Sequence, residues 1–161
     1  MQTLKSVLII LVVFGGIFIL SKFSAVPKSE DSVSSGPGKV CYIWNTEAGD
    51  KGLLVMNING EKVDGTLDIA IAQKDKKSGS FTGDLISLNS NADSTMVYGI
   101  WDNMQEGVQN KEQLWIKLNG SVASPGFGPM QDGGKGIYVY ADPGKISYDL
   151  NLQKADCATV N

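Results

Sequence analysis

The sequence predicts an all-β domain, namely a small antiparallel meander barrel of about eight strands, preceded by one N-terminal transmembrane helix. Short runs in which apolar residues recur at every second position indicate strands with one buried face. The chain contains 19 Gly, and Asn-Gly, Asp-Gly and Pro-Gly pairs separate these runs. Consecutive hairpins favour a meander, and two chain ends that are tied together favour closure into a barrel. A β-sandwich is the alternative.

The clearest pattern lies in residues 98–120, which we interpret as two strands that each carry one Trp. In the second strand Leu114, Ile116 and Leu118 alternate with Gln113, Trp115 and Lys117. A period of two places these sets on opposite faces of the sheet. The pair Asn119-Gly120 tolerates positive φ at both residues and predicts a tight type I′ turn. Residues 102–110 are polar, so we expect a turn or short loop there.

Residues 1–21 form the predicted signal anchor, because Lys5 precedes an apolar run from about Val7 to Leu20. This run is at the short end of the roughly 17–25 residues that a spanning helix needs. An A-x-A type cleavage site is missing, which favours an uncleaved anchor over a cleaved signal peptide. With an uncleaved anchor the chain is a single-pass protein of the cell membrane, whereas with a cleaved signal peptide the domain is secreted.

Residues 22–39 are rich in Ser, Pro, Gly and charge, and predict a flexible linker before a domain at 40–161. Cys41 opens the first expected strand and Cys157 lies near the C-terminus. Two cysteines at opposite ends of one domain predict a disulfide between the first and last strands. That bond requires an oxidising compartment, and so predicts a C-terminal domain outside the cytoplasm.

Further strands follow from alternation of the same kind. We expect them at residues 40–44, 53–58, 61–72, 81–88, 137–140 and 146–153. A bulge or bend is expected at Asp64-Gly65 and a bulge between Leu85 and Ile86. The stretches 73–80 and 121–136 are expected to be a charged turn and a mobile rim loop.

Composition excludes several classes of site. There is no His, which removes Ser-His-Asp and Cys-His catalysis and imidazole metal ligands. Two Cys cannot build a zinc or iron–sulfur cage, so we expect no metal and no cofactor. The formal net charge of −3 and the lack of a basic patch argue against nucleic-acid binding. We therefore expect that the protein is not an enzyme. A hydrolase that uses only carboxylates, drawn from Asp102, Glu106, Glu112 and Asp132, is the least favoured alternative.

Candidate contact residues come from the aromatic side chains of the Trp hairpin and of the Tyr-x-Tyr segment. An indole at position 115, between Gln113 and Lys117, could stack on a sugar or a peptide, or could cover the outer wall of the barrel. The candidate ligand or partner surface comprises Trp101, Trp115, Glu106, Tyr138 and Tyr140.

The order of features resembles a group of uncharacterised bacterial proteins that are membrane-anchored or exported. These features are an anchor, a Cys near the domain start, the hairpin YGIWDNMQEGVQNKEQLWIKLNG, a Tyr-x-Tyr segment and a late Cys. The barrel also resembles calycins in outline, without the Gly-x-Trp signature of lipocalins. No activity follows from either resemblance.

The sequence therefore predicts a tethered binding or interaction module of unknown ligand. Its partners are the cytoplasmic membrane, through the N-terminal helix, and a small ligand, a glycan or an envelope protein. An envelope hydrolase inhibitor or a structural envelope protein is the alternative, which an interior filled by side chains would favour.

Overall fold

A computed structural model describes residues 38–72, 74, 76–87 and 95–160. The predicted anchor and most of the predicted linker lie outside these residues. Within the described part of the chain, no helix is long and apolar enough to cross a membrane.

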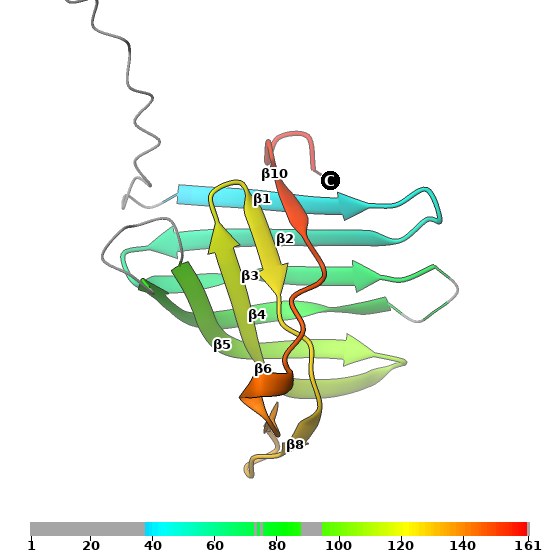
Figure 1. Cartoon of the computed structure of the whole chain (residues 1–161), viewed down its shortest axis with the longest axis vertical. Coiled ribbons are helices and arrows are strands. Elements are labelled where there is room, and N and C mark those ends of the chain that lie inside the picture. Colours follow the sequence, from blue (N-terminus) through cyan, green and yellow to red (C-terminus); the bar gives the residue numbers. More distant parts are fainter. Residues whose placement is uncertain (1–37, 73, 75, 88–94, 161) are drawn as a thin grey trace, which may run out of the picture. The chain divides into compact units, whose positions relative to one another are not determined.

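The described residues form an all-β domain with ten strands and one short 3₁₀ helix. The strands are β1 (Gly38–Asn45), β2 (Lys51–Asn59), β3 (Lys62–Ala70), β4 (Lys76–Ser87), β5 (Thr95–Gln105), β6 (Val108–Asn119), β7 (Val122–Pro125), β8 (Met130–Asp132), β9 (Tyr138–Tyr140) and β10 (Leu152–Ala155). The helix η1 (Pro143–Lys145) follows β9. In Figure 1, β1 to β4 run side by side across the view, while β7 and β10 cross them.

Eight of these strands close into an antiparallel barrel, as the sequence predicts. Strands β1 to β7 pair with their neighbours in chain order, and β10 returns to fill the space between β7 and β1. Strands β8 and β9 stand outside the ring, where Tyr138 of β9 bridges to Glu112 of β6. The prediction of a meander is therefore correct up to β7, and the last strand reaches its place through a long connection.

The core of the barrel follows the predicted alternation. Leu54 and Met56 of β2 and Leu67 of β3 are fully buried, as are Leu114 and Ile116 of β6. The inward side of β5 carries Val97, Trp101 and Asn103. These side chains fill most of the interior, and burial of this apolar set, at about 25 cal/mol per Å², is the main force that closes the sheet.

The predicted bulge between Leu85 and Ile86 is absent, and Asp64-Gly65, where a bulge or a bend is expected, contains no bulge. Pairing of β2 with β3, of β3 with β4 and of β4 with β5 proceeds without a skipped residue. Close approach of neighbouring backbones at glycines takes the place of bulges. A Cβ atom at Gly79 would lie 2.0 Å from the carbonyl oxygen of Asp102. The sheet therefore bends where a strand has no side chain on its inner face.

Two of the turn predictions need correction. Gln105 pairs with Val108, so residues 102–110 are strand on both sides of the two-residue turn Glu106-Gly107 rather than a loop. Both turn residues have positive φ, 53° and 76°, as a type I′ turn requires. At the other hairpin Asn119 pairs with Val122, so the turn is Gly120-Ser121. Only Gly120 has positive φ there, which fits type II′ instead of the predicted I′.

Four segment predictions were wrong in extent. β1 begins at Gly38, inside the predicted linker, and β4 begins at Lys76, inside the predicted charged turn. The expected rim loop 121–136 contains β7, whose residues Ala123 to Pro125 are buried. The expected last strand at 146–153 begins its ladder only at Leu152. We call residues 126–151, which connect β7 to β10, the strap.

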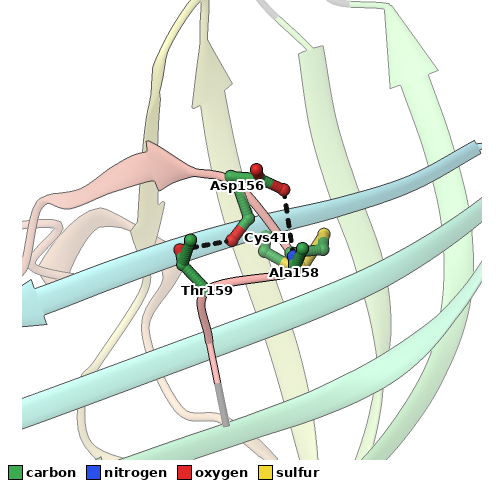
Figure 2. Close-up of a disulfide and its surroundings, with 5 residues drawn as sticks. Cys41, Asp156, Ala158 and Thr159 are labelled. Carbon is green, nitrogen blue, oxygen red and sulfur yellow. Dashed lines mark hydrogen bonds between the residues drawn. A yellow bond between two sulfur atoms is a disulfide. The ribbon is translucent and has the colours of Figure 1, made fainter.

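The predicted disulfide is present and joins Cys41 of β1 to Cys157, just after β10, with the two Cα atoms 5.2 Å apart. The residues around Cys157 form a turn centred on Asp156 (Figure 2). The Asp156 side chain accepts from the backbone N–H of Ala158, and its carbonyl accepts from the Thr159 hydroxyl. The bond thus secures the strand that completes the ring.

Candidate functional site

A pocket of about 390 Å³ opens near one end of the barrel, between the ends of β3 and β5 and the start of β4. We call it the mouth pocket. Its lining residues are Ile69, Ile71, Lys74, Lys77, Gln105, Glu106 and Phe127. Three adjacent strands each contribute one side chain to this opening, because Lys77 of β4 pairs in register with both Ile69 of β3 and Gln105 of β5. The period of two along each strand points these side chains to the same face.

The strap supplies Phe127 to the mouth pocket. The backbone of Phe127 exchanges two hydrogen bonds with Ser147, of 2.9 and 2.8 Å, within the strap itself. The N–H of the preceding Gly126 donates to the carbonyl of Trp115 on β6, at 2.7 Å. The ring is 37% exposed, so an apolar surface faces solvent at a fixed position on the rim.

A second cavity of about 120 Å³, the side pocket, lies where the strap meets β6. Lys77 and Phe127 line both pockets. The remaining lining residues are Trp101, Glu112, Gln113, Leu114, Gly126, Gly128, Met130 and Tyr140.

Lys77 and Glu112 form an ion pair that sits inside the barrel opening. The Lys77 side chain is 22% exposed and that of Glu112 is 14% exposed. The Lys77 ammonium also lies 4.9 Å from the centre of the Trp101 ring. Removing one partner of a buried pair leaves an uncompensated charge, so this arrangement depends on both residues.

The five predicted contact residues do not form a single surface. Trp101 is only 2% exposed; it faces the interior, and its indole N–H donates to the Gly79 carbonyl at 3.2 Å. Trp115 lies on the outer wall, between the rings of Tyr98 and Tyr140 at centroid distances of 4.9 and 5.5 Å. The indole of Trp115 is therefore covered by aromatic neighbours.

The remaining predicted residues have separate surroundings. Glu106 occupies the β5–β6 turn and lines the mouth pocket. Tyr138 is 45% exposed on β9. Tyr140 is buried and donates its hydroxyl to the Gly126 carbonyl at 2.8 Å, and burial raises the pKa of Tyr140 to about 12. This hydroxyl bond lies within the strap, whereas the backbone N–H of Tyr140 donates to Gln113 Oε1 at 3.2 Å and links the strap to β6.

The four acidic residues of the hydrolase alternative are dispersed. Neither pocket is lined by two of them, since Glu106 lines the mouth pocket and Glu112 the side pocket. Asp102 accepts from the Gln109 amide at 2.8 Å and pairs with Lys111, and the first of these contacts contributes most to lowering its pKa. Asp132 accepts from the Gly134 N–H in a local turn. This placement gives no support to paired acid–base chemistry.

Sequence reasoning missed most of the mouth pocket. The sequence predicts a charged turn at Lys77 and a loop at Phe127, and places Ile69 and Ile71 in a strand without indicating a pocket. Asn103 was also missed, although it is 1% exposed and its Oδ1 has no hydrogen-bond partner among the described residues. The available signal was the inward phase of β5, which places Asn103 two residues beyond Trp101 on the same face.

The described residues contain no cluster of three or more Cys, Asp or Glu side chains that could hold a metal ion. No protein-family model, curated protein or solved structure matches the chain in comparisons.

Proposed function

We propose that this protein is a membrane-tethered, non-enzymatic binding module that acts outside the cytoplasm and receives a small ligand in the mouth pocket. The mouth pocket carries the proposal. Its volume, about 390 Å³, lies within the roughly 300–1,000 Å³ range of small-molecule sites. Its lining combines an apolar surface, from Ile69, Ile71 and Phe127, with a few polar groups that can orient a ligand.

The tether and the compartment rest on two other features. The apolar run from about Val7 to Leu20 supports an anchor at the membrane. The bond between Cys41 and Cys157 supports an oxidising location, since cytosolic thiols are kept reduced. A domain tied in this way can present its barrel opening to molecules that pass near the membrane.

Binding is tested with the full-length protein in lipid nanodiscs, labelled with 5-fluorotryptophan, which gives one ¹⁹F signal for each of the three Trp residues. Three probes share a six-carbon chain: hexanol, hexanoate and hexylammonium. We expect at least one probe to shift the Trp101 signal saturably, because the Trp101 ring lies 4.9 Å from the ammonium group of Lys77, which lines the mouth pocket. The Trp44 signal serves as the internal reference.

A pair of variants locates the binding. Ile71→Tyr narrows the mouth pocket and is expected to weaken the response, whereas Ile86→Tyr, at an exposed position outside both pockets, is expected to leave it unchanged. If no probe shifts Trp101, or if both variants bind as the wild type does, the mouth pocket is not the binding site.

A further inference from the structure

The Lys77 ammonium occupies a position built for a cation. On one side it pairs with the Glu112 carboxylate, and on another it lies 4.9 Å from the Trp101 ring centre. A carboxylate and the negative face of an indole both attract positive charge, and they do so more strongly where water is excluded. The ion pair is more than three-quarters buried, as its exposed fractions show.

The surroundings of this position also favour positive charge. The side pocket next to it is lined by three aromatic residues, Trp101, Phe127 and Tyr140, and Glu112 is its acidic residue. Asn103, whose buried Oδ1 has no partner among the described residues, lies two residues from Trp101 on the same face of β5 and lines neither pocket.

The two members of the ion pair differ in how easily each can be replaced. Lys77 lines both pockets, so its long, flexible stem has an open path toward the mouth. Glu112 has a shorter side chain, and its backbone is fixed between β5 and the bridge to Tyr138. An incoming ammonium group can therefore take the place of the Lys77 ammonium. An incoming anion would instead lie beside the Glu112 carboxylate and be repelled by it.

We propose that Glu112, Trp101 and the side pocket form an ammonium-binding site, which Lys77 fills when no ligand is bound. The ligand class is a primary ammonium group on an apolar chain: the chain lies against Ile69, Ile71 and Phe127, and the ammonium group displaces that of Lys77. Lys77 acts as a tethered competitor, with an effective concentration in the millimolar range typical of short tethers. This inference rests on the proposed function of the mouth pocket.

Charge selectivity in the wild-type protein is the first test, and it uses the same three probes. Hexylammonium is expected to shift the Trp101 ¹⁹F signal with an affinity about tenfold higher than that of hexanol, and hexanoate is expected to bind more weakly than either. Equal affinities, or a preference for hexanoate, would overturn the ammonium site while leaving the mouth pocket as a binding site. If none of the probes binds, the proposed function fails as well.

Removal of the internal competitor is the second test. Lys77→Met keeps an unbranched side chain that is one atom shorter and removes its charge, and is expected to raise the affinity for hexylammonium by about tenfold or more. Lys76→Met, on the neighbouring exposed residue that pairs with Asp68, is expected to change it less than twofold. Glu112→Gln is expected to abolish the preference for hexylammonium over hexanol.

Folding of each variant is checked by thermal unfolding before titration, and added hexylammonium should raise the unfolding temperature of Lys77→Met more than that of the wild type. A folded Lys77→Met protein that binds hexylammonium no better than the wild type contradicts the competitor role. The selectivity of the wild-type protein tests the site even if this variant does not fold.

Discussion

At the residue scale, most of the singled-out aromatic side chains contribute to packing. Trp101 is an interior residue, and Trp115 is covered by Tyr98 and Tyr140 on the outer wall. The sequence pattern correctly placed the two Trp residues on their strands and Trp115 on the outer face, but Trp101, expected on the contact surface, is buried. The strap covering Trp115 could not be predicted, because the contact between residues 115 and 140 depends on the path of an irregular segment.

Tyr140 makes stability sensitive to alkaline pH. Its folded pKa, about 12, lies above the ordinary value of 10.0 because the phenol is buried. The corresponding stabilisation is complete below pH 10 and is lost as the pH rises from 10 toward 12, because the unfolded state releases the proton first. The loss is at most about 2–3 kcal/mol.

The free energy of unfolding of the variant Tyr140→Phe should be about 1 kcal/mol lower at neutral pH, because the hydrogen bond to Gly126 is lost. Above pH 10 its free energy of unfolding should fall less steeply than that of the wild type. Tyr42, whose pKa is also raised by burial, accounts for part of the decline that remains. Urea unfolding between pH 8 and 11.5 measures both effects, with Tyr138→Phe as the exposed control. Identical slopes for Tyr140→Phe and the wild type would rule out this role.

At the element scale, alternation predicts strands well where at least one neighbouring strand is long. β2 and β6 are both present where the sequence predicts strands, and their ladders extend beyond the predicted ends. Alternation failed at residues 146–151, whose pattern resembles that of a strand but whose backbone pairs only through Ser147 with Phe127. The reverse error occurred at β7, where four residues ending in Pro125 carried too weak a signal.

Close strand contacts at glycines predict a large effect from a small substitution. In Gly79→Ala the new methyl group would meet backbone atoms, Asp102 O at 2.0 Å and Asn103 Cα at 2.6 Å. Because β5 must move away to admit it, we expect a loss of about 2–4 kcal/mol in the free energy of unfolding. Ser80→Ala, at an exposed position on the same strand, should stay within about 0.5 kcal/mol. Chemical denaturation compares them, and similar stabilities would show that the sheet bends for another reason.

At the scale of the whole molecule, the barrel and its disulfide were predictable and the mouth pocket was not. Two cysteines at the ends of a run of hairpins were enough to infer closure. The mouth pocket brings Lys77 of β4 and Gln105 of β5 together with Phe127 from the strap. No local pattern links residues that meet only after the ring has closed.

The disulfide spans 116 residues of sequence, so its removal should release a large amount of chain entropy in the unfolded state. In the chain-entropy model a loop of this length corresponds to about 4–5 kcal/mol. The double variant Cys41→Ser with Cys157→Ser should lose about that much in the free energy of unfolding, measured by guanidinium titration. A loss below about 1 kcal/mol would indicate that the hydrogen-bonded ladder alone holds β10 in place.

Mass spectrometry of protein taken from its native cells, without reductant, should find both sulfurs oxidised.

The direction of β1 determines how far Gly38 lies from the mouth pocket. Gly38, at one end of β1, pairs with Ile58 of β2, and Asn45 lies at the other end of β1. The rim residue Ile69 pairs with Gly52 of β2, which in turn pairs with Trp44, next to Asn45. From Gly38 to Trp44, which lies level with Ile69, six residue steps of extended chain span roughly 20 Å. A chain segment that enters the described domain at Gly38 therefore joins it at the end away from the mouth pocket.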